Sequence, residues 1–171
     1  LGLKFAAVAG ATGAAGAPGA GATGAPDEAS RRELDAYVSQ MQAVLERNFA
    51  NGFQPGPAGI CKSFDLVSRR PLNSDMPWWN LPETMRAAAY CAHFARDAAA
   101  RGRALAILAR CHNAFALHYV RPDFHYTAYQ TRDAGGRPVN VIPATADADP
   151  GYHTGLSIID MLELLFYSSS T

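Results

Sequence analysis

Five residues in this chain have types and positions suited to carbohydrate chemistry. Trp78 and Trp79, the two tryptophans of the chain, lie just before a predicted helix, and Tyr152 with His153 lies before another. Exposed indole rings can stack on the apolar face of a pyranose, and an imidazole can accept or donate a proton near neutral pH. Glu83 falls in the first turn of the helix that follows the tryptophans. We therefore predict that these residues face a sugar.

Each of these residues also has a purely structural interpretation. The tryptophans can fill a core, Glu83 can complete a helix cap and favour the helix dipole, and His153 can cap or pack. Their matching places at the starts of two separate helices favour the functional interpretation. We expect one tryptophan to stack on a ligand and the other to pack.

Helical periodicity of the apolar residues predicts the elements that position this site. A capping box at Ser30 to Glu33 starts a first helix that ends near Gly52, and a cap at Asn80 starts a second helix. The expected helix ranges are 30–52, 80–100, 103–121 and 154–166, with a break at 101–102.

The long connections have a β-rich composition. Residues 60–67 read as a short strand followed by a turn at 69–73, and residues 125–131 with 139–142 read as a β-hairpin with a Gly-rich turn. Long loops thus alternate with a short one. This order is typical of α/α hairpins in a toroid, whose long loops meet inner-helix starts on one face, although helical bundles and solenoids share parts of it. The predicted fold class is therefore all-α.

Composition limits the partners. Lys plus Arg and Asp plus Glu balance at 15 each, so no long-range field gathers nucleic acid or anionic lipid. No long apolar run predicts a membrane span. Three cysteines do not make a disulfide framework, and pairs such as Cys91 with His93 or Cys111 with His112 point in different directions on a helix, so we expect free thiols and no metal site.

Residues 1–29 form a low-complexity Ala/Gly-rich segment that we predict to be disordered, leaving 30–171 as the folded domain. Lys4 followed by an apolar stretch faintly resembles a secretory signal, so an exported protein with a signal remnant at 1–25 is the alternative. A linker or translated scar is the preferred interpretation. The expected location is cytoplasmic.

Three motifs resemble the N-acylglucosamine 2-epimerase superfamily, which includes cellobiose 2-epimerases and aldose-ketose isomerases. They are similar to the family's Trp-Trp-x-x-x-Glu start of an inner helix, its Asp-x-x-Gly-x-Pro hairpin turn and its Tyr-His start of the last inner helix. In this chain they read PWWNLPETMRAA (77–88), TRDAGGRPVN (131–140) and PGYHTGLSIIDMLELL (150–165). The resemblance covers most of residues 31–167.

The resemblance implies part of an (α/α)6 barrel of the six-hairpin glycosidase-like type. It also implies removal and return of a proton beside a sugar carbonyl, without metal or other cofactor. His153 would be one of two acid/base histidines. Trp78 or Trp79 would stack on a mono- or oligosaccharide, Tyr152 would lie beside the substrate, and Glu83 would bind or orient it.

The chain departs from this family pattern at three places. The family's second histidine, in a His-x-x-Glu setting on an earlier helix, would fall in the low-complexity tract, and Leu81 and Leu156 replace a usual Gln and Arg. We therefore expect a fragment equivalent to the C-terminal third of a barrel, with no measurable turnover alone and with self-association through its unpaired hairpin flanks. The alternatives are a six-hairpin glycoside hydrolase or lyase fragment and a non-catalytic carbohydrate-binding module.

Overall fold

The computed structural model describes residues 27–125, 127–141 and 153–167. Of the segment 1–29 that is predicted to be disordered, residues 1–26 lie outside these ranges. At the end of that segment, Glu28 and Ala29 belong to the first helix.

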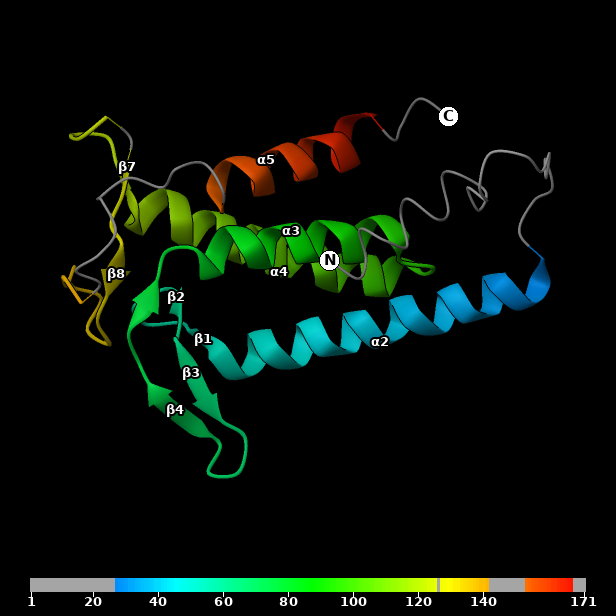
Figure 1. Ribbon diagram of the computed structural model, residues 1–171, viewed down its shortest axis with the longest axis horizontal. Helices are drawn as coiled ribbons and strands as arrows, with labels where there is room; N and C mark the ends of the chain where they lie inside the picture. Colours follow the sequence, from blue (N-terminus) through cyan, green and yellow to red (C-terminus); the bar gives the residue numbers. More distant parts are fainter. Residues whose placement is uncertain (1–26, 126, 142–152, 168–171) are drawn as a thin grey trace, which may run out of the picture.

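Four α-helices and a short π-helix form the body of the described chain. The α-helices are α2 (Glu28–Gly52), α3 (Asn80–Phe94), α4 (Ala98–His118) and α5 (Thr154–Leu162), and the π-helix η1 (Glu163–Tyr167) continues α5. Helix α3 packs against each of the other three α-helices. Figure 1 shows the helices lying side by side, with α3 and α4 between α2 and α5.

The connections between the helices form four two-stranded antiparallel sheets of very short strands, gathered at one end of the helices (Figure 1). The pairs are β1 (Phe53–Gln54) with β2 (Gly59–Ile60), β3 (Ser63–Asp65) with β4 (Arg70–Asn73), β5 (Met76–Pro77) with β8 (Thr131–Arg132), and β6 (Val120–Arg121) with β7 (Thr127–Ala128). The β5 and β8 pair joins connections that lie far apart in the sequence.

The prediction of an all-α fold built as part of an (α/α)6 toroid is wrong. The described residues form a mixed arrangement of helices and small antiparallel sheets. Helical periodicity detects amphipathic helices well, but strands of two to four residues are too short to show a period of two. The alternation of long and short connections therefore overstated the helical content.

Several predicted element boundaries are also wrong. Helix α2 is capped by the Asp27 side chain, which accepts a hydrogen bond from the Ser30 amide, rather than by a capping box at Ser30. Helix α3 ends at Phe94, and Asp97 caps α4 by accepting from the Ala100 amide at 2.7 Å.

The predicted break at 101–102 therefore lies inside α4. The predicted turn at 69–73 is largely strand β4. The predicted hairpin at 125–142 is present only next to its Gly-rich turn, where Arg132 and Pro138 form an antiparallel bridge and the Asp133 and Val139 amides donate to the Arg137 and Thr131 carbonyl oxygens. Strands β7 and β8 pair with other connections, and residues 126 and 142 lie outside the described ranges.

Small side chains fill the contact between α3 and α4. Ala88, Ala89 and Cys91 of α3 and Ala104 and Cys111 of α4 are all completely buried. Side chains of this size allow two helices to approach closely, so this pair forms the centre of the core.

Tyr119 anchors the sheet end of the molecule to this core. Its buried hydroxyl donates to the Met76 carbonyl oxygen at 3.0 Å, and its ring lies beneath the guanidinium of Arg132. Arg132 in turn donates to the carbonyl oxygens of Pro57 and Gly136. These contacts hold the loop before α3 in one place, and that loop carries the two tryptophans.

Candidate functional site

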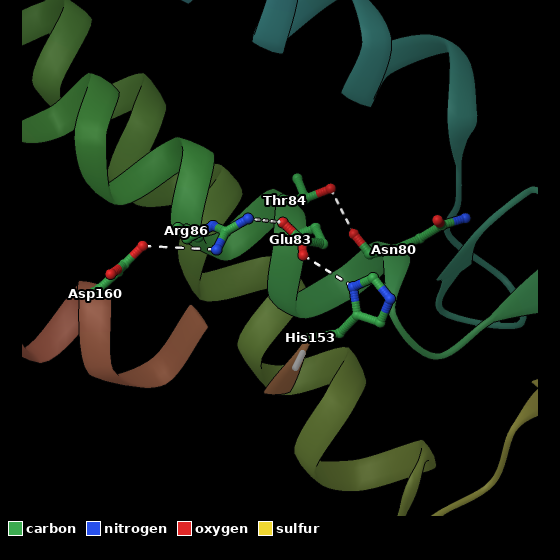
Figure 2. A network of polar contacts seen from close by, with 6 residues as sticks. All are labelled: Asn80, Glu83, Thr84, Arg86, His153 and Asp160. Carbon is green, nitrogen blue, oxygen red and sulfur yellow. Dashed lines mark hydrogen bonds and ion pairs between the residues drawn. The ribbon is translucent and has the colours of Figure 1, made fainter. Parts of the chain in front are cut away.

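His153 and Glu83 meet at the starts of α5 and α3. Nδ1 of His153 lies 2.9 Å from Oε1 of Glu83, and the two side chains remain 36% and 31% exposed (Figure 2). An ionised carboxylate can only accept a hydrogen bond, so this contact favours the tautomer of His153 that is protonated at Nδ1. The neutral ring then has its lone pair on Nε2. This arrangement is suited to proton transfer by Nε2.

The tryptophan rings border the imidazole of His153 on two sides. The Trp79 ring stacks on it with centroids 6.1 Å apart, and the Trp78 ring meets it edge-on at 5.8 Å. Trp78 is only 4% exposed and belongs to the core, whereas Trp79 is partly exposed. Of the two rings, Trp79 is thus the one with surface left for stacking on a ligand.

Glu83 also links His153 to a series of ion pairs. Its Oε2 pairs with Nη2 of Arg86, and Nη1 of Arg86 lies 3.6 Å from Oδ2 of Asp160 (Figure 2). Asp160 is on α5, so this helix contacts α3 with both His153 and Asp160. Negative and positive side chains alternate in this series of ion pairs, so each carboxylate lies beside a cation.

A cleft of about 830 Å³ is lined by residues of α2, β2, α3 and α5, Glu83 among them. Its volume lies within the range of small-molecule sites. Helix α2 contributes mostly apolar side chains to the lining, and α3 contributes both polar and apolar ones. The apolar lining residues on α2 are Met41, Val44, Leu45 and Phe49, and the polar or charged ones on α3 include Asn80, Glu83, Thr84 and Arg86. Trp79 and His153 are not among the described residues that line the cleft, so Glu83 connects the cleft to the histidine.

The structure brings together three of the five predicted site residues on partly exposed surface: Trp79, Glu83 and His153. Trp78 contacts the same imidazole from the core, and Tyr152 lies outside the described residues. The predicted capping box at Asn80 is wrong. Trp79 is the N-cap residue without a side-chain cap, and the Glu83 carboxylate is directed to His153 and Arg86.

Arg86 and Asp160 were missed by reasoning from the sequence. Arg86 had a usable signal, since it lies three residues after Glu83 and so shares its helix face. Asp160 follows His153 by seven residues, which is two helical turns, but its apolar neighbours gave no indication of an ion pair across helices.

The other histidines have surroundings of their own. His93 contacts the Phe94 ring, His112 faces the Asn113 side chain, and His125 contacts the Phe124 ring. His118 is exposed at the end of α4. In the described ranges, no group of three or more potential ligands is arranged to hold a metal ion.

No model of a known protein family matches this chain, and no curated protein matches it significantly. The similarity to the epimerase superfamily therefore stays a prediction based on three short motifs. Within the part of the chain that is described, no helix combines the length and apolar character needed to cross a membrane.

Proposed function

We propose that this chain carries an acid/base site of a sugar epimerase or aldose-ketose isomerase. The observation that supports the proposal is the His153–Glu83 hydrogen bond beside the partly exposed Trp79 ring. In this reaction Nε2 of His153 takes the proton from the carbon next to the sugar carbonyl. The electron pair of the broken C–H bond moves toward the carbonyl oxygen, and an enediolate forms, which takes the proton back from Nε2 when the step is reversed.

Each neighbour of His153 has a separate role in this proposal. Glu83 holds the ring through Nδ1 and stabilises the imidazolium that forms when Nε2 accepts the proton. Trp79 stacks on the apolar face of the sugar. The cleft that Glu83 helps to line accommodates the rest of a mono- or oligosaccharide, because its polar side chains from α3 offer partners for sugar hydroxyls.

A single base, His153, on one face of the sugar carbon limits which reaction the site can complete. A single histidine removes and returns the proton on the same side of the carbon, so it supports exchange of that proton more readily than inversion. The other described histidines contact residues elsewhere, as given above. The expectation of no measurable turnover by the purified chain therefore applies to conversion of one epimer into the other, whereas slow exchange of the proton needs His153 alone.

The test is incubation of the chain with aldoses in deuterated water. We expect slow deuterium incorporation at C2 that disappears in His153→Ala and persists in His112→Ala, a matched change of an exposed histidine on α4. Sugar binding without any incorporation would instead identify a non-catalytic carbohydrate-binding protein. Release of reducing ends from an oligosaccharide would identify a glycoside hydrolase.

The cysteines bear on where this chemistry takes place. Cys61, Cys91 and Cys111 are all buried and unpaired. Unpaired thiols persist in a reducing compartment, so we propose a cytoplasmic location.

A further inference from the structure

We propose that Asp160 is a positioning residue for His153, acting through Arg86 and Glu83. The inference rests on the proposed function, because positioning matters only if His153 transfers a proton. It adds two residues, Arg86 and Asp160, to a site that the sequence motifs place at Trp79, Glu83 and His153.

The first support is the way the two helices alternate along this chain of contacts. Helix α5 and its N-cap residue supply both ends, Asp160 and His153, which are seven residues apart and so lie about 10 Å apart along one face. Helix α3 supplies the two middle members, Glu83 and Arg86, one turn apart. Each end residue faces its own partner on α3 (Figure 2). The contacts therefore fix the helix that begins at His153 at two points.

The second support is that the four side chains become steadily more buried from His153 to Asp160. The exposed fraction falls from 36% at His153 to 31% at Glu83, 22% at Arg86 and 3% at Asp160. A buried carboxylate is strongly disfavoured without a cation beside it, so the Asp160 charge favours a position of Arg86 close to it. The rigid end lies inside the protein, and the end that meets a ligand lies at the surface.

The third support is that Arg86 uses a different nitrogen for each carboxylate. Nη1 lies 3.6 Å from Oδ2 of Asp160 and Nη2 pairs with Oε2 of Glu83, so one orientation of the planar guanidinium places a nitrogen beside each carboxylate. Without the Asp160 charge, Arg86 can turn to follow Glu83 alone. The Glu83 carboxylate then loses its fixed position, and its Oε1 no longer stays aligned with Nδ1 of His153.

The test reads the imidazole directly by nitrogen-15 NMR, in the full chain and without any sugar. Signals of His153 are assigned by their loss in His153→Asn. We expect the wild type to show the neutral form protonated at Nδ1, and Asp160→Asn to show a mixture with the form protonated at Nε2. Glu163→Gln removes an exposed carboxylate just beyond α5 and should leave the wild-type pattern.

The kinetic arm compares the same variants by deuterium exchange at C2. We expect Asp160→Asn to lower the exchange rate about 10-fold or more, since small misplacements of a catalytic group are costly, and to leave sugar affinity almost unchanged. If Asp160→Asn does not fold, the double variant Arg86→Gln with Asp160→Asn leaves no buried charge unpaired and should show the same NMR mixture.

An unchanged His153 spectrum in every folded variant would overturn the positioning role. Because the spectra are recorded without sugar, this result is distinct from a failure of the proposed function. That failure would appear as no exchange in the wild type, with the dependence of the His153 spectrum on Asp160 intact.

Discussion

At the residue scale, adjacent tryptophans have opposite surroundings. Trp78 is buried among core residues, whereas Trp79 keeps exposed surface beside His153. We expect Trp78→Ala to lower the free energy of unfolding by about 3–5 kcal/mol, as large-to-small changes in a core do. Trp79→Ala should cost about 1 kcal/mol or less and should abolish sugar binding. Urea unfolding and sugar titrations measure the two effects, and equal destabilisation by both changes would contradict the assignment.

Two core thiols give a second residue-scale prediction. Burial raises the pKa of Cys91 to about 11 and that of Cys111 to about 12, from 9.0. The thiolate is the reactive form, so both thiols should be almost inert to an alkylating reagent at pH 8 and react readily in urea.

The same thiols should make the fold sensitive to alkali. Since the unfolded chain loses these protons at lower pH than the folded chain, the stability contributed by the buried thiols is complete below pH 9. It should then decline up to about pH 12. A smaller decline in Cys111→Ala than in wild type is the expected control, and rapid alkylation of the native protein would contradict this view.

The candidate site shows how far residue types can predict geometry. Trp79, Glu83 and His153 were grouped because each follows a loop and precedes or begins a helix, and the structure places them in contact. Their role toward a sugar stays a prediction. The Arg86 and Asp160 pair could not be predicted, because an ion pair between two helices depends on how the helices dock rather than on either sequence alone.

At the element scale, the start of α4 depends on one side chain. The Asp97 carboxylate accepts the Ala100 amide, and the break in helix between α3 and α4 falls just before it. We expect Asp97→Ala to lower the free energy of unfolding by about 1 kcal/mol, the usual effect of losing an N-cap. Asp97→Asn keeps an oxygen acceptor and should cost much less. Thermal or urea unfolding distinguishes them, and equal losses would mean that the cap does not stabilise α4.

This boundary also shows why the helix ends were harder to predict than the helices. Gly102 looked like the break, but it lies in α4 with open space around its Cα. One exposed glycine costs about 1 kcal/mol in a helix, and the burial of Ala104, Ile107 and Cys111 outweighs it. The asparagine and proline before Glu83 suggested a side-chain cap at Asn80, whose amide instead donates to the Ile60 carbonyl oxygen.

At the scale of the whole molecule, α3 is the central element. It packs against α2, α4 and α5 and supplies Glu83 and Arg86 to the site. The small sheets at one end fix the loop that leads into α3, through contacts such as that between Tyr119 and Met76. The sequence predicted the helices because each is long enough for the apolar period to repeat several times. It did not predict this assembly, because pairing of β5 with β8 is set by tertiary contacts between distant loops.

The last prediction concerns association between copies of the chain. Ile159, Leu162 and Phe166 follow one another at helical spacing along α5 and η1 and are 54%, 46% and 67% exposed. Burying such a stripe against a second copy removes apolar surface from water, so we expect sedimentation to become faster as protein concentration rises. Leu162→Lys should suppress this change. Leu117→Lys, at an exposed leucine on α4, should not. A monomer at every concentration, or equal effects of the two lysines, would rule out association through α5.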